Sequence, residues 1–80
     1  MYYFYVIQSD IDGSLYFGSA DDLKRRFREH NSGLCKSTKN KTPWTAVYYE
    51  AYDSLKKARY REWKVKNSAH EYRKIKERIL

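Results

Sequence analysis

The sequence predicts a small α+β domain, and three observations support this class. Two strand-like segments near the start of the chain are joined by an Asp-Gly turn. A third strand-like segment, over residues 44–52, comes after a helical stretch, and helical periodicity fills the remainder. The chain has 80 residues, which suffices for one small core, so we expect residues 1–80 to form a single domain.

The first two strands should form an antiparallel hairpin. Residues 2–8, YYFYVIQ, are a continuous aromatic and β-branched run, which is typical of a central strand buried on both faces. Residues 9–13 form the turn, and residues 14–18 form the return strand. The register of this turn decides whether Tyr5 lies opposite Tyr16.

A helix is expected over about residues 21–31, with a stop near Gly33. Gly18, just before the helix, has no side chain and would let backbone or a ligand approach closely. The candidates for capping and for the acidic first turn are Ser19, Asp21 and Asp22.

Two polar residues of this helix lie beside the apolar face that Leu23 and Phe27 define. Arg26 and His30 are four residues apart, so they lie one above the other on the helix. Solubility does not require a charged and a titratable group at that position. The pattern therefore predicts a functional site.

Residues 32–43 are polar and basic, and two interpretations stay open. The segment is either a plain surface connection or a flap that contacts phosphate. We expect its three lysines to bind nucleic acid, together with two residues near the junction of strand and helix. The expected set is Ser19, Arg25, Lys36, Lys39 and Lys41.

A second helix should begin after the Asp53-Ser54 cap and run to about Lys66, and a third should cover residues 69–80. Glu62 lies in the middle of the apolar stripe of the second helix, where a carboxylate is unexpected. The stripe consists of Leu55, Ala58 and Val65.

The charge of the chain points to a polyanionic partner. Lys and Arg number 17 against 10 Asp and Glu, and the net charge is +7, spread along the whole chain. Such a basic fold most often binds nucleic acid, although ordinary solubility charge is the alternative. The single cysteine, Cys35, excludes an internal disulfide. No apolar run could span a membrane and no signal peptide is visible, so we expect a cytoplasmic protein without membrane association.

Five polar side chains occupy positions where apolar ones are expected: Tyr5, Tyr16, Arg26, His30 and Glu62. Each has an ordinary explanation. The tyrosines could be core residues with satisfied hydroxyls, Arg26 could pair with Glu62 between helices, and His30 could interact with the helix dipole. Taken together on a basic domain, they predict a site that cleaves phosphodiesters.

The chemistry of that reaction explains the residue types. An arginine fork neutralises the charge that develops on the phosphate. A lone carboxylate with water ligands is an ordinary magnesium site. A tyrosine can act as the base if nearby cations stabilise its phenolate.

The sequence resembles the GIY-YIG endonucleases, in particular the small stand-alone bacterial domains related to the N-terminal nuclease of the UvrC repair protein. Tyr3-Phe4-Tyr5 stands in place of GIY, and Tyr16-Phe17-Gly18 stands in place of YIG. The run SADDLKRRFREH matches the helix motif of the family, and PWTAVYYE and ARYRE are typical of the stand-alone group.

The resemblance implies a small three-stranded antiparallel sheet flanked by helices, and one Mg²⁺ or Mn²⁺ held by Glu62. It implies that Tyr16 is the base or positions the nucleophile, with support from Tyr5. Arg26 would stabilise the phosphate, and His30 would assist proton transfer or contact phosphate. Family members often carry a later asparagine in the site, and we do not assign that role to Asn67, only five residues beyond Glu62.

Three functional hypotheses follow. The leading one is a metal-dependent DNA endonuclease that acts on branched, flapped or damaged DNA in repair or recombination, with a partner protein supplying target specificity. Without a separate DNA-binding domain, it should bind DNA weakly and with strong salt dependence. The alternative is a non-catalytic nucleic-acid-binding module with the same fold. A third is an interaction subunit that docks through Trp44, Trp63 or the tyrosine-rich strands.

Overall fold

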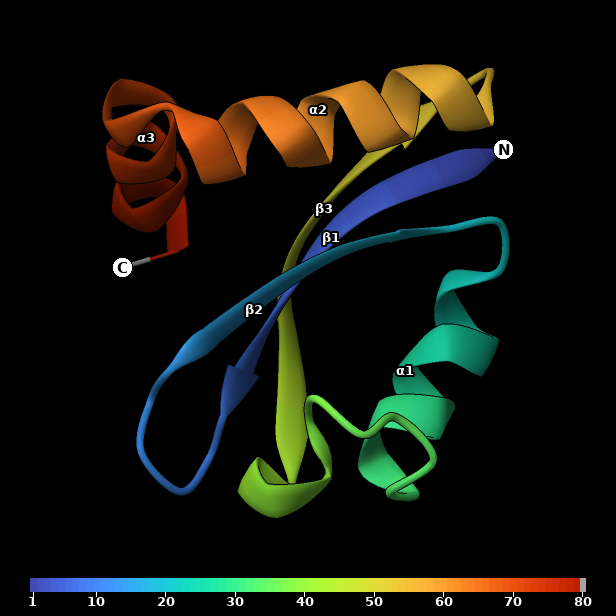
Figure 1. Ribbon diagram of the computed structural model, residues 1–80, viewed down its shortest axis with the longest axis vertical. Helices are drawn as coiled ribbons and strands as arrows, with labels where there is room; N and C mark the ends of the chain where they lie inside the picture. Colours follow the sequence, from blue (N-terminus) through green and yellow to red (C-terminus); the bar gives the residue numbers. More distant parts are fainter. Residues whose placement is uncertain (80) are drawn as a thin grey trace.

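The computed structural model describes residues 1–79 as one three-stranded antiparallel sheet with helices on both faces (Figure 1). The predicted α+β class and the antiparallel sheet are therefore confirmed. The elements are β1 (Tyr2–Ser9), β2 (Leu15–Ala20), α1 (Leu23–Asn31), the 3₁₀ turn η1 (Lys39–Lys41), β3 (Trp44–Tyr52), α2 (Leu55–Asn67) and α3 (Ala69–Ile79).

Strand β1 is the middle strand, between β2 and β3, as its unbroken apolar sequence predicts. The register of the hairpin pairs Tyr5 with Gly18 and Ile7 with Tyr16. The side chains of Tyr5 and Tyr16 thus lie on the same face of the sheet. They are not directly opposite each other, because Tyr16 pairs with Ile7, two residues beyond Tyr5.

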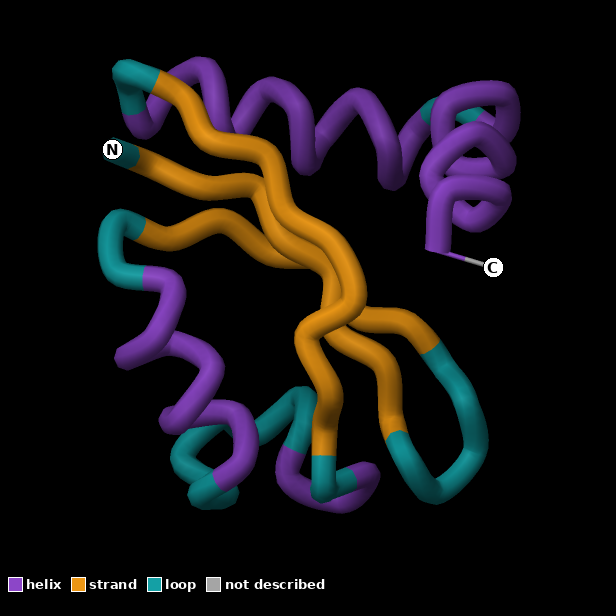
Figure 2. Tube along the Cα trace, turned by 180° about the vertical axis from the view of Figure 1, so that it is seen from behind, coloured by secondary structure: helices purple, strands orange, loops and turns teal. Residues whose placement is uncertain are grey.

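Alternation along β1 and β2 creates two cores, one on each face of the sheet. Toward α2 and α3, the buried residues are Phe4, Val6, Phe17, Val65 and Ile75. Toward α1, they are Tyr5, Ile7, Ala20 and Trp44, with Leu23 and Phe27 packed against them. Figure 2 shows α1 and the α2–α3 pair on opposite sides of the strands.

Helices α1 and α2, like α3, begin at a side-chain cap. Asp22 accepts a hydrogen bond from the Arg25 amide at 3.0 Å, and Ser54 accepts one from the Lys57 amide at 3.2 Å. Of the predicted bounds, β2 continues two residues beyond Gly18, and the predicted end of the third helix at Leu80 lies outside the described residues. Across residues 1–79, no helix has both the length and the apolar character that crossing a membrane requires.

An ion network ties the last three elements together. Arg61 of α2 contacts Glu50 of β3 with its Nε at 2.9 Å, and Glu71 of α3 with its Nη1 at 3.1 Å. Tyr48 and Tyr52 donate hydrogen bonds to the two oxygens of Glu50. Burial alone would raise the pKa of Glu50, but the hydrogen bonds from Arg61 and the two tyrosines outweigh burial and lower it.

Candidate active site

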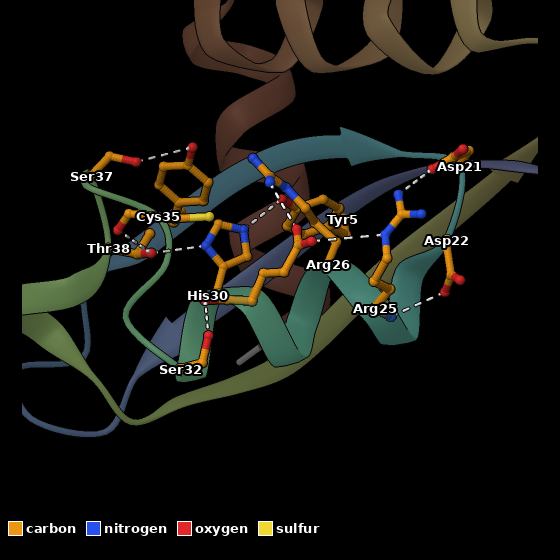
Figure 3. A network of polar contacts seen from close by, with 12 residues as sticks. Tyr5, Asp21, Asp22, Arg25, Arg26, His30, Ser32, Cys35, Ser37 and Thr38 are labelled. Atoms are coloured by element: carbon orange, nitrogen blue, oxygen red, sulfur yellow. Dashed lines mark hydrogen bonds and ion pairs between the residues drawn. The ribbon is translucent and has the colours of Figure 1, made fainter.

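A chain of hydrogen bonds between buried side chains lies at the centre of the α1 face (Figure 3). The Tyr5 hydroxyl lies 2.7 Å from Nε2 of His30, and Nδ1 of His30 lies 2.9 Å from the Thr38 hydroxyl. Thr38 donates its own proton to the Cys35 carbonyl at 3.3 Å, so its oxygen accepts from Nδ1–H of His30. This assignment leaves Nε2 as the acceptor for the Tyr5 proton.

Burial sets the protonation of this chain. It lowers the pKa of His30, and the nearby Arg26 cation lowers it further. It raises the pKa of Tyr5 to about 12, with Arg26 opposing the shift. At neutral pH both groups are therefore uncharged, and Nε2 of the imidazole accepts the hydrogen bond from Tyr5.

Gly18 provides the space that Tyr5 occupies. A Cβ at position 18 would lie 2.3 Å from the Tyr5 hydroxyl oxygen and 2.5 Å from its Cζ. Real Cβ atoms do not approach other atoms so closely, so only glycine fits under the ring. The close approach that the sequence predicts at Gly18 is made by a side chain of the protein itself.

Tyr16 lies beside this chain and is more accessible than Tyr5. Its ring meets the His30 ring edge-to-face with centroids 5.1 Å apart, and it meets Trp44 in the same way at 6.3 Å. The Ser37 hydroxyl donates to the Tyr16 hydroxyl at 3.4 Å. Tyr16 is only partly buried, whereas Tyr5 is 2% exposed.

Arg26 projects from α1 next to Tyr5 (Figure 3). Its Nη1 donates to Glu29 at 3.0 Å, and its side chain is 38% exposed. A guanidinium has five N–H donors, so the contact with Glu29 leaves donors for a phosphate. The hydrogen bond to Glu29 raises the pKa of Arg26, which is a permanent cation.

A cleft of about 480 Å³ runs along the outer edge of β2, between α1 and α2. Arg26 and Glu29 line it from α1, Ser19 lines it from β2 and Arg59 lines it from α2. Ser19 also donates a hydrogen bond to Glu62 at 2.7 Å, which places the Glu62 carboxylate against the same strand.

The structure brings four of the five predicted residues together, namely Tyr5, Tyr16, Arg26 and His30, on the α1 face of the sheet. Glu62 lies on the α2 face and reaches the edge strand through Ser19. The alternative of an ion pair between Arg26 and Glu62 is wrong. Arg26 pairs with Glu29, and Glu62 pairs with Lys66 at 2.6 Å.

The residues predicted to contact nucleic acid are dispersed. Arg25 lines the cleft and pairs with Asp21 at 2.8 Å. Lys36 and Lys39 are exposed in the segment after α1. Lys41 contacts Asp12 at 3.3 Å, at the hairpin turn. The fifth, Ser19, is bonded to the Glu62 carboxylate as described above.

The donor set at the β2 edge fits a hydrated Mg²⁺ or Mn²⁺. Residues 1–79 contain no group of three or more His, Cys, Asp or Glu side chains suited to a metal, so a metal ion held by Glu62 would take most of its ligands from water. Such an arrangement matches the preference of magnesium for few protein ligands. Glu62 is 22% exposed and its partner Lys66 is 44% exposed, so solvent reaches both side chains of this pair.

Two residues near the site have no sequence signal. Thr38 is buried and orients His30, yet it stands in an ordinary run of polar residues. Ser37 reaches Tyr16 from the same run. Their roles depend on how this segment folds back over α1, and nothing local in the sequence encodes that path.

Comparison with known proteins identifies the family of this chain. The GIY-YIG catalytic domain family matches residues 1–76. A UPF0213 protein of Staphylococcus aureus is 38% identical over 80 residues, covering 96% of each chain. One from Haloquadratum walsbyi is 38% identical over 71 residues, covering 88% of this chain and 79% of its own.

A solved structure has the same fold. The solution NMR structure of a UPF0213 protein from Bacillus halodurans is 32% identical and superposes with a TM-score of 0.56. The match covers 94% of this chain and 82% of that one. The chain therefore belongs to the GIY-YIG family of nuclease domains, among the small UPF0213 proteins.

Proposed function

We propose that this protein is a divalent-metal-dependent DNA endonuclease that hydrolyses phosphodiester bonds in branched, flapped or damaged DNA. We place its work in repair or recombination, in the cytoplasm, with a partner protein supplying the target. Its membership of a nuclease family supports the reaction type. The observation that carries the proposal is the buried Tyr5–His30–Thr38 chain beside a partly buried Tyr16 and the Arg26 cation.

Tyr16 is the better candidate for contact with the attacking water. A general base must reach the proton that it takes, and the Tyr5 hydroxyl is buried and already bonded to His30. Tyr16 is more accessible and packs edge-on against the same imidazole. In this proposal the hydrogen-bonded pair of Tyr5 and His30 holds the Tyr16 ring in place.

Arg26 would stabilise the phosphate. Its guanidinium lines the β2-edge cleft and lies near Tyr5, so an oxygen of a phosphate in the cleft would meet a cation with free donors. As negative charge builds on the phosphate oxygens in the transition state, the interaction with a fixed cation strengthens.

Glu62, which is bonded to the cleft residue Ser19, would hold the metal ion, with Lys66 displaced. A bound divalent ion supplies Lewis-acid stabilisation of the phosphate and of the leaving oxygen. The hydrogen bond from Ser19 orients the carboxylate, which is the role that outer partners have at metal sites.

A non-catalytic DNA-binding module is the second candidate, and specific contacts favour it. Both oxygens of Glu62 have protein partners, Ser19 and Lys66, and Arg26 is engaged by Glu29. In that case the same cleft would bind a phosphate without cleaving it.

Cleavage assays with matched variants separate the two candidates. Nicked, flapped and supercoiled DNA is incubated with the protein and Mg²⁺ or Mn²⁺, with EDTA added as a control. We expect cleavage by the wild type, and loss of it with EDTA and in Glu62→Gln. The matched control, Glu77→Gln, changes an exposed carboxylate of α3 and should cleave normally. If the wild type binds all three DNAs but cleaves none better than Glu62→Gln, the module is correct.

A further inference from the structure

The outward face of α2 carries two exposed aromatic rings that no part of the site uses. Tyr60 is 60% exposed and Trp63 is 59% exposed. Their rings stack, with centroids 6.1 Å apart and planes at 24°. The core side of this helix is supplied by other residues, Ala58 and Val65, so packing does not require these rings. We refer to Tyr60 and Trp63 as the aromatic pair.

Basic side chains surround the aromatic pair. Lys56 and Lys64 are each four residues from Tyr60, and Arg59 is four residues before Trp63, so all three are its neighbours on the helix surface. A groove of about 590 Å³ is lined by Tyr60 together with both lysines. Within residues 1–79, these three cations form no ion pair, whereas the adjacent Lys57 is bound to Asp53.

This surface is complementary to a nucleic acid rather than to a protein. The only acidic residue of α2 is Glu62, which faces Ser19 and Lys66. Exposed aromatic residues alone would also suit the core of a protein interface, but lysines are depleted from such cores. Stacked rings between cations are instead the arrangement that holds the bases and phosphates of a single strand.

The aromatic pair is continuous with the cleft at the β2 edge. Arg59 lines that cleft and also neighbours Trp63 on the helix. Trp63 directly follows Glu62 in the chain. A strand that leaves the cleft along α2 therefore passes Arg59 and reaches the rings.

We infer that the outward face of α2 binds an unpaired nucleic-acid strand, with bases stacked on Tyr60 and Trp63 and phosphates on Lys56, Arg59 and Lys64. Binding by this face is independent of catalysis. For cleavage, this binding would give a preference for DNA in which a single strand adjoins the duplex. That consequence rests on the proposed nuclease function.

Binding is tested without metal, with a labelled oligothymidine of about 12 nucleotides, a length within the range of single-strand sites. Fluorescence anisotropy at low salt gives the affinity. Trp63→Ala and Tyr60→Ala should each bind about tenfold more weakly, because each removes one base–aromatic stack. Trp63→Phe should retain most of the affinity. Tyr49→Ala is the matched control, because Tyr49 is 60% exposed but lies on β3.

Two results would overturn the inference. One is unchanged oligothymidine affinity in both alanine variants, with circular dichroism showing that they are folded. The other is self-association of the wild type that Trp63→Ala abolishes, which would make the pair a contact between two copies. Failure of nuclease activity leaves this binding result intact. If the nuclease is active, Trp63→Ala should lower the ratio of flap to duplex cleavage while duplex nicking persists.

Discussion

Replacement of Gly18 by alanine would place a methyl group inside the space of the Tyr5 ring. The new Cβ would lie 2.3 Å from the phenol oxygen, and even the ring carbon Cζ would be only 2.5 Å away. Tyr5 cannot swing aside freely, because it is 2% exposed and its hydroxyl is bonded to His30 at 2.7 Å. Either the strand shifts or the ring moves and the hydrogen bond to His30 breaks.

Two contributions determine how much the Gly18→Ala substitution lowers the free energy of unfolding. Overpacking a close-packed core costs about 1–3 kcal/mol, and leaving a buried hydroxyl unpaired costs a similar amount, roughly 1–3 kcal/mol. Since one distortion relieves the other, we expect a loss of about 1–3 kcal/mol in the free energy of unfolding, not the sum. Each 1 kcal/mol lowers the melting temperature of a domain of this size by roughly 4–8 °C. Urea denaturation followed by circular dichroism measures the difference.

A double-mutant cycle isolates the mechanism. In a Tyr5→Val background the ring is absent, so the Gly18→Ala substitution should cost much less than it does in the wild type. If Gly18→Ala is as stable as the wild type, or if its cost is the same in both backgrounds, the steric argument fails.

Four other predictions follow from the described contacts. The His30 imidazole, followed by proton NMR, should titrate below its ordinary value of 6.5, and a midpoint at or above that value contradicts the buried neutral form. Tyr16→Phe should reduce cleavage by about 10²–10⁴-fold with little change in DNA binding, and a parallel loss of binding would contradict its role as base. Folding lowers the pKa of Glu50, so the stability that its ionised carboxylate contributes is complete above the ordinary pKa of 4.5 and is lost as the pH falls below that value. The free energy of unfolding of Glu50→Gln should therefore depend less on pH in that range than that of the wild type. Lys66→Ala should lower the Mg²⁺ concentration needed for half-maximal cleavage, because Lys66 competes for Glu62.

The local elements were predictable because their chemistry is local. The aromatic run and the Asp-Gly turn specify the hairpin, and Gly13 has a φ of 75° that favours glycine. The helical period placed Glu62 on the stripe with Ala58 and Val65, and its side chain is indeed only 22% exposed. The sequence predicts that β2 ends at Gly18, because Ser19 has the chemistry of a helix cap, whereas pairing with β1 extends the strand through Ala20.

Features that depend on distant contacts were not predictable. Thr38 is buried because its segment packs over His30, and a polar run does not encode that path. Arg61 contacts one carboxylate on β3, Glu50, and one on α3, Glu71. Neither partner lies on the helix of Arg61, so helical periodicity does not predict these ion pairs. The register that pairs Tyr5 with Gly18 depends on the turn and on both cores together.

The Arg61 network also has a consequence for the neighbouring residue, Glu62. A helix that rests on a sheet can roll about its own axis, and a roll would swing Glu62 away from Ser19. Contacts from Glu50 on one strand and Glu71 on another helix oppose that rotation from two directions. The angle at which α2 presents its carboxylate is thus fixed jointly by β3 and the C-terminal helix α3, so loss of Glu71 in α3 would misalign Glu62 through Arg61.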